Sequence, residues 1–273
     1  MKKYLCSLLA LLCLCGCTAP TPEPTQPKQT EPTIPETTQA TQPEQTQPTE
    51  PAPTEPTPTE PTKPLHSELY MEEVSQEQML TYFEEVVLNI EYTTSQTGIL
   101  RKWTEPIVYR IIGDATQEDL RVLDELFTQL NEVPGFPGIY PAEVGDFPNL
   151  VMYFQDRDEF RLAFSQVVNG EEADGAVQFW FYNATNNIYK GNIGYRTDID
   201  QATRSSVLVE EIINLLGITD TVLRPDSITY QYGSEVMQLS AVDWAILKML
   251  YHPAMECGMD KDTCAAVLAE LYY

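Results

Sequence analysis

Residues 18–64 constrain the fold most, because they cannot form a packed core. They contain 14 Pro, 14 Thr, 7 Glu and 6 Gln in 47 positions, and Ile34 is the one large aliphatic residue. Such a segment buries too little apolar surface to offset the entropy lost on folding. Its proline density favours a polyproline II chain of roughly 145 Å when fully extended, at about 3.1 Å per residue. We therefore expect an extended stalk, followed by one folded domain over residues 65–273.

The N-terminus reads as a removable export signal. Two lysines precede an apolar run from Tyr4 to Cys15, which is shorter than the roughly 20 residues of a membrane-spanning helix. The run ends in Leu14-Cys15-Gly16-Cys17, which resembles a bacterial lipobox. This pattern predicts a signal peptide over residues 1–16 and acylation of Cys17. An ordinary secreted protein with a cysteine-rich leader is the alternative.

A lipid on Cys17 implies an extracytoplasmic protein that is anchored to the bacterial cell membrane. Residues 17–64 would then hold the lipidated cysteine and the stalk that projects the domain. The domain itself carries 34 acidic and 12 basic residues, a balance of −22, which argues against nucleic acid and against docking on anionic lipid by charge. Besides the membrane, the expected partners are a cell-wall or surface peptide, glycan or protein.

The folded part alternates between helical and strand patterns. Apolar residues at helical spacing predict helices over 75–92, 116–131, 157–168, 201–216, 240–251 and 260–272. Runs rich in β-branched and aromatic residues predict strands over 107–112, 149–154, 176–182 and 188–195, the last two as a hairpin, and residues 134–148 read as a loop. This order predicts an α+β domain, with a mixed twisted sheet packed on helices and a helical C-terminal part. The same order of elements occurs in zinc peptidases of the metzincin kind.

The segment from Glu210 to Asp220 has the register of a metal-peptidase motif. Metzincins use His-Glu-x-x-His-x-x-Gly-x-x-His, in which ligands four residues apart share one helix face and the Glu activates the metal-bound water. Here Glu210 stands at the first ligand position, Glu211 at the general base and Asn214 at the second ligand. Gly217 stands at the turn and Asp220 at the third ligand, where some metzincins carry Asp.

Several pieces of the chain, over roughly residues 100–270, resemble a bacterial family of unknown function. That family contains exported proteins and lipoproteins, and its domain looks like a zinc peptidase that has lost its histidines. The resemblance implies a metzincin-like fold and not an activity. The matching pieces are Arg101-Lys102-Trp103-Thr104-Glu105-Pro106-Ile107, Leu208-Val209-Glu210-Glu211, Leu216-Gly217 with Asp220, Pro225-Asp226-Ser227-Ile228, Asp243, Leu250-Tyr251-His252-Pro253 and Gly258-Met259.

The loss of histidine changes what this motif can bind. An amide is a weak ligand for zinc, so Glu210, Asn214 and Asp220 form an all-oxygen set that suits calcium or magnesium better. The sequence therefore leaves two states open. Either no cofactor binds and these residues have structural roles, or a divalent metal is held by their oxygen atoms and Glu211 acts as the base.

Two functional hypotheses follow. The first is a non-catalytic surface lipoprotein, a pseudo-metallopeptidase whose vestigial cleft binds a peptide, glycan or protein partner. The second is a metal-dependent hydrolase with Glu211 as its general base. We favour the first, because Glu210-Glu211-x-x-Asn214 replaces the usual His-Glu-x-x-His.

Three further residues bear on these alternatives. Cys257 and Cys264 are the two cysteines beyond Cys17, and an even pair in an exported domain forms either a disulfide or two free thiols. Met237 follows the long helix at the place where metzincins carry a methionine beneath the metal, although a methionine here is more often part of the core.

Overall fold

The structure, a computed structural model, describes residues 69–88, 98–168, 172–232 and 236–272. The expected signal peptide at 1–16, the lipidation site Cys17 and the stalk over 17–64 lie outside the described residues. Among the helices that the structure does describe, none is both long and apolar enough to cross a bilayer.

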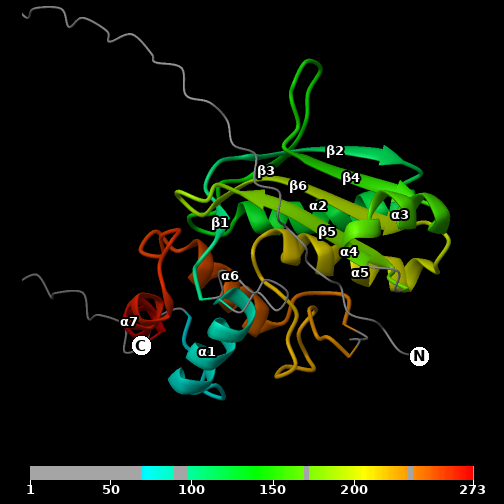
Figure 1. Cartoon of the computed structure of the whole chain (residues 1–273). Helices are drawn as coiled ribbons and strands as arrows, with labels where there is room; N and C mark the ends of the chain where they lie inside the picture. The colour runs from blue at the N-terminus through cyan, green and yellow to red at the C-terminus, as the bar shows by residue number, and fades with distance from the viewer. Residues whose placement is uncertain (1–68, 89–97, 169–171, 233–235, 273) are drawn as a thin grey trace, which may run out of the picture. The chain divides into compact units, whose positions relative to one another are not determined.

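One sheet organises the described part of the chain (Figure 1). Its main path runs β1-β6-β4-β2-β3 with parallel pairing throughout, and β5 pairs antiparallel with β6. The predicted mixed sheet is therefore confirmed. Its parallel pairs need crossover connections: α2 connects β2 to β3, and α3, α4 and β5 lie between β4 and β6. The strands are β1 (Lys102–Trp103), β2 (Ile107–Gly113), β3 (Ile139–Pro141), β4 (Leu150–Gln155), β5 (Gly175–Phe181) and β6 (Asn187–Arg196).

The helices begin where the sequence offers N-caps. Thr116 and Ser240 each form a capping box with the residue three positions later, and the Asp200 side chain accepts from the backbone of Thr203. The helices are α1 (Gln76–Phe83), continued by a π-helical turn (Glu84–Leu88), then α2 (Gln117–Asn131), α3 (Arg157–Ala163), α4 (Ser165–Val168), α5 (Gln201–Leu215), α6 (Ala241–Tyr251) and α7 (Lys261–Tyr272).

Two sequence-based assignments differ from the structure. Strands β1 and β3 were not expected, because two or three residues show no periodicity, and β3 lies inside the segment 134–148 that reads as a loop. The helix expected over 157–168 is broken at Phe164, where the backbone leaves helical geometry. For the helix expected over 75–92, residues 89–92 lie outside the described residues, and the described helical part extends to Leu88.

The two faces of the sheet are covered by different helices. Along β6, a side chain at Gly191 would meet Leu215 of α5, whereas one at Gly194 would meet Phe164, which follows α3. Because these glycines are three residues apart on one strand, they face opposite sides. The α5 side carries the main core, to which α2 also contributes, and the α3–α4 side carries a small second core around Phe160.

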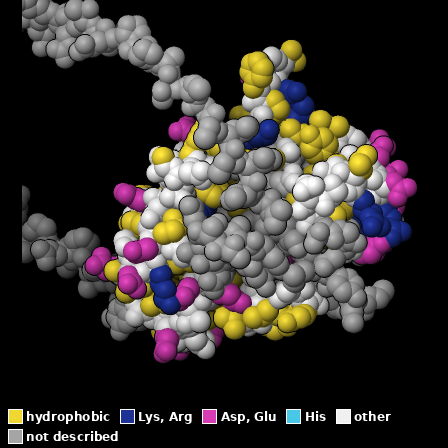
Figure 2. Space-filling view, in the orientation of Figure 1, with side chains coloured by type: hydrophobic (Ala, Val, Ile, Leu, Met, Phe, Trp, Pro, Cys, Tyr) yellow, Lys and Arg dark blue, Asp and Glu magenta, His cyan; other side chains and the backbone are white. Residues whose placement is uncertain are grey.

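The loop between β3 and β4 projects from the sheet, as Figure 1 shows. Val144 and Phe147 on this loop are almost fully exposed, and Figure 2 shows apolar side chains at its tip. At the C-terminus, the Tyr272 hydroxyl donates to the Val74 carbonyl at 2.6 Å, which ties α7 to the start of α1.

Candidate functional site

Helix α5 carries most of the predicted site residues, and its C-terminal end is shaped by Gly217. This glycine has φ +102°, and its amide donates to the Asn214 carbonyl at 3.1 Å. A β-carbon at this position would lie 2.6 Å from the Arg101 carbonyl oxygen. Glycine is therefore required both for the left-handed turn and for the close approach of Arg101, the residue before β1.

The Gly217 turn brings two of the three proposed ligands together. The Asn214 amide donates to Asp220 Oδ1 at 3.3 Å. Asn214 is 6 % exposed, and its Oδ1 accepts no hydrogen bond within the described residues. The two side chains are therefore joined by a hydrogen bond, in which the amide nitrogen of Asn214 faces the carboxylate.

Glu211 points into the seam between α5 and the sheet. It is 3 % exposed, and a β-carbon added to Gly175 of β5 would lie 2.8 Å from its Oε1. Burial and the nearby charge of Glu211 raise the pKa of Tyr195 well above its usual value. The carboxylate thus lies in the packed interior. Neighbouring Glu210 is partly exposed, about 100° further round the helix.

Within the described ranges, no three His, Cys, Asp or Glu side chains gather in a way that could hold a metal ion. Asn214 is not one of these residue types, so the set of Glu210, Asn214 and Asp220 has to be judged by its geometry. In that geometry, Asn214 donates a hydrogen bond to Asp220, so these two of the three side chains are in contact.

The other predicted residues lie apart from this motif. Met237 is 46 % exposed, so it belongs neither to the core nor to a position beneath α5. Cys257 and Cys264 are free thiols in the structure, which is the second of the two states that the sequence leaves open. Burial raises the pKa of both thiols, that of Cys264 to about 11, so neither is readily ionised at neutral pH.

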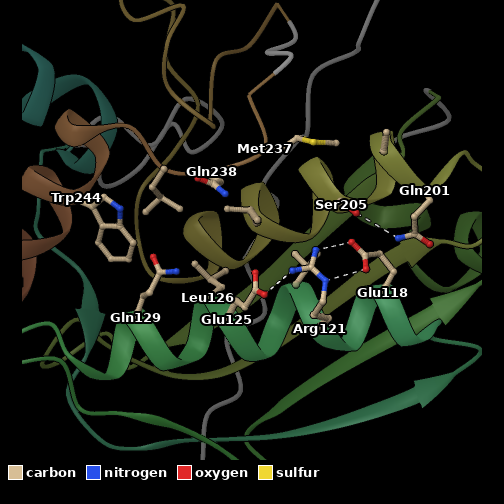
Figure 3. A pocket seen from close by; sticks show the side chains of 14 residues that line it. Glu118, Arg121, Glu125, Leu126, Gln129, Gln201, Ser205, Met237, Gln238 and Trp244 are labelled. Carbon is tan, nitrogen blue, oxygen red and sulfur yellow. Dashed lines mark hydrogen bonds and ion pairs between the residues drawn. The ribbon is translucent and has the colours of Figure 1, made fainter.

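A pocket of about 490 Å³ lies on another side of α5 and was not predicted from the sequence. Its walls are α2 and the N-terminal half of α5, and residues 237–239 together with Trp244 of α6 complete it (Figure 3). The predicted residues Glu210, Glu211, Asn214 and Asp220 are not among its lining residues. The sequence did not indicate this pocket, because the α2 residues that line it have the pattern of an ordinary solvent-exposed helix face.

Three charged side chains on α2 form one rim of the pocket. Arg121 donates to both carboxylate oxygens of Glu118 at 2.9 and 2.6 Å, and to Glu125 at 2.5 Å. These pairs lie three and four residues apart, as helix geometry favours. The rim therefore carries two carboxylates and one guanidinium that is already bonded to both.

A buried ion pair fixes the two walls against each other. Asp119 of α2 is fully buried and accepts from Arg204 Nε of α5 at 2.9 Å and from the Gln201 amide at 2.7 Å. Arg204 also donates to the Thr197 carbonyl at 2.9 Å. Burial alone would raise the pKa of Asp119, but hydrogen bonds from Arg204, Gln201 and Thr116 outweigh it and lower that pKa. The pocket is therefore held open by a satisfied polar cluster.

In a comparison with protein families, residues 76–270 match the family described as "Protein of unknown function (DUF2927)". No curated protein matches the chain. The family match covers the described sheet with its helices, and it includes both α5 and the pocket. Because this match spans more than half of the chain, the protein belongs to the DUF2927 family of proteins of unknown function.

Proposed function

We propose that this chain is a cell-surface lipoprotein, anchored through Cys17, whose folded part is a metallopeptidase-like domain that binds a partner and does not hydrolyse it. The observation that carries the proposal is the burial of Glu211, which is 3 % exposed and packs on Gly175. A general base has to reach the water or proton that it activates. A carboxylate in the packed seam between helix and sheet is poorly placed for that role.

The fold supports the metallopeptidase-like part of the proposal. Helix α5 packs beneath β5 and β6, and β5 is the antiparallel strand of an otherwise parallel sheet. The Gly217 turn returns the chain so that Asp220 meets Asn214. This contact joins two of the three positions that carry ligands in the motif, with oxygen-bearing side chains in place of the histidines.

Hydrolysis assays test the proposal directly. The purified full chain is incubated with a library of internally quenched peptides, with added calcium, magnesium, manganese or zinc, and Glu211→Gln serves as the isosteric control. We expect both proteins to give the same background signal. Metal-dependent cleavage by the wild type that is lost in a folded Glu211→Gln variant would overturn the proposal.

One observation favours a second candidate, the metal-dependent hydrolase. The Oδ1 atom of Asn214 is buried and has no hydrogen-bond partner in the described part of the chain. The nitrogen of the same amide donates a hydrogen bond to Asp220. A hard cation held by Glu210, Asn214 and Asp220 would satisfy that oxygen. Under this alternative, Glu211 acts as the base after a rearrangement that exposes it.

A further inference from the structure

The pocket between α2 and α5 has the properties of a built binding site. Its volume of about 490 Å³ lies within the range of small-ligand pockets. Leu126 and Val209 form fixed apolar walls, since both are almost completely buried. Because Asp119 and Arg204 hold the two helices together beneath the rim, the site is formed before any ligand arrives, which reduces the entropy cost of binding.

Polar side chains also line this pocket. The side-chain amides of Gln129 and Gln238 line the pocket near Trp244 and are exposed to solvent, so they are accessible to a ligand (Figure 3). Each amide offers donors and an acceptor. Together they match a peptide group, which carries one N–H and one C=O.

The charged side chains of the rim, Glu118, Arg121 and Glu125, disfavour the binding of an anionic ligand. Arg121 is bonded to Glu118 and Glu125 at the same time, which leaves no unpaired cation at that edge. Two carboxylates against one guanidinium leave an excess negative charge, within a chain of formal net charge −25. A basic side chain next to Glu118 or Glu125 would be attracted, and the attraction would weaken with salt.

We propose that this pocket binds a short peptide segment in which an apolar side chain is followed by a basic one. The apolar side chain lies against Leu126 and Val209, the peptide group meets the amides of Gln129 and Gln238, and the basic side chain reaches the glutamates of α2. A neutral glycan fits less well, because it carries no positive charge for the glutamates of the rim to attract. This inference rests on the proposed function in treating the domain as a binding module.

Calorimetric titration of the purified full chain with capped hexapeptides tests the proposal. The probes share one frame and differ at two positions, as Leu-Lys, Ser-Lys and Leu-Glu. We expect the Leu-Lys peptide to bind, with affinity lower by about tenfold or more for each of the other two. Equal binding of all three, or no binding of Leu-Lys, would overturn the proposal.

Two pairs of variants locate the binding site. Ala202→Trp places a large side chain at an exposed lining position and should abolish binding, whereas Thr128→Trp, exposed on α2 outside the lining, should not. Glu125→Gln should weaken binding of the Leu-Lys peptide and reduce its salt dependence, whereas Asp124→Asn, on the next residue but outside the lining, should leave both unchanged. Retained binding in Ala202→Trp would place the peptide elsewhere and contradict the inference.

Two further outcomes separate this inference from the proposed function. Binding of a neutral oligosaccharide that Ala202→Trp abolishes, without peptide binding, would overturn the peptide assignment and leave the domain a non-catalytic binding module. Cleavage of the bound peptide, lost in Glu211→Gln, would overturn the proposed function. In that case, peptide binding that is lost in Ala202→Trp would still support the pocket between α2 and α5 as the peptide-binding site.

Discussion

The two halves of helix α5 differ in how their side chains are used. Towards its C-terminus, Glu211 is packed against β5, and Asn214 is bonded to Asp220 across the Gly217 turn. Towards its N-terminus, Ala202 and Ser205 line a pocket of about 490 Å³. The C-terminal half of α5 carries the motif register and is packed against the sheet; we call it the closed half. The N-terminal half carries no motif and borders the pocket; we call it the open half. Motif spacing therefore indicates which residues meet, whereas access depends on the elements packed around them.

The difference has a local cause at each end. Beneath the closed half, Gly175 has no side chain, which lets Glu211 approach β5 closely. Beside the open half, Ser206 donates to the Val236 carbonyl at 2.9 Å, which fixes the position of the segment that includes Gln238. That segment completes the pocket and leaves its interior unfilled.

The largest expected effect comes from Asp119→Ala, which would leave Arg204 buried and without its carboxylate partner. We expect the free energy of unfolding to fall by about 3–5 kcal/mol, because an uncompensated buried charge is costly. Urea denaturation measures the change, with the exposed Asp124→Ala as the control. A loss no larger than that of the control would show that the ion pair does not hold α2 against α5.

A smaller effect is expected in the closed half. In Gly175→Ala, the new methyl group would lie 2.4 Å from Val207 Cγ1 and 2.8 Å from Glu211 Oε1. Such overpacking costs about 1–3 kcal/mol. Adding Val207→Ala should recover part of the loss, and Ala202→Leu in the open half should change stability by less than about 0.5 kcal/mol. Equal costs in both halves would contradict the difference between them.

Lowering the pH should destabilise the folded protein by protonating Asp119, which pairs with Arg204 of α5. The pKa of Asp119 is lowered in the folded state, so the folded protein holds a proton less readily than the unfolded chain does. This contribution to stability is complete above the unfolded pKa, near 3.9, and is lost as the pH falls through the lower folded pKa. Urea titrations between pH 7 and pH 2 should show a flatter acid limb in Asp119→Asn than in the wild type. Parallel curves would rule out this role for Asp119.

The smallest effect is expected at the rim of the pocket. Arg121, Glu118 and Glu125 are all about half exposed, so solvent screens their ion pairs. Arg121→Ala should leave the midpoint of urea denaturation within experimental error, at low and at high salt alike. A clear loss of stability would mean that the rim is part of the fold and not a surface available to a ligand.

Local chemistry made much of the fold predictable. The capping boxes at Thr116 and Ser240 fix where α2 and α6 begin, and the side chain of Asp200 caps α5. Strands β1 and β3 were missed because they are too short for a pattern and form only through pairing with β6 and β2. In the α5 motif, the register gives Asn214 and Asp220 as two candidate ligand positions, and the structure joins these two side chains by a hydrogen bond.

The rest of the site depends on contacts that are distant in the sequence. The depth of Glu211 is set by Gly175, on a strand that precedes α5. The pocket requires α2 and α5 to pack together, and the bond that joins them, between Arg204 and Asp119, spans 85 residues. Neither feature leaves a spacing signal in a single sequence, because each partner alone fits an ordinary helix or strand.

Our proposal that the domain binds a partner without hydrolysing it implies that the α5 motif holds no metal, and the most direct test is the metal content of the purified full chain. The protein is dialysed against buffer that contains calcium, magnesium, manganese and zinc, and bound metal is measured by mass spectrometry. We predict no stoichiometric metal, with Glu210→Ala and Asp220→Ala indistinguishable from the wild type. About one equivalent of metal in the wild type, lost in both variants but kept in the exposed control Asp262→Ala, would contradict the claim.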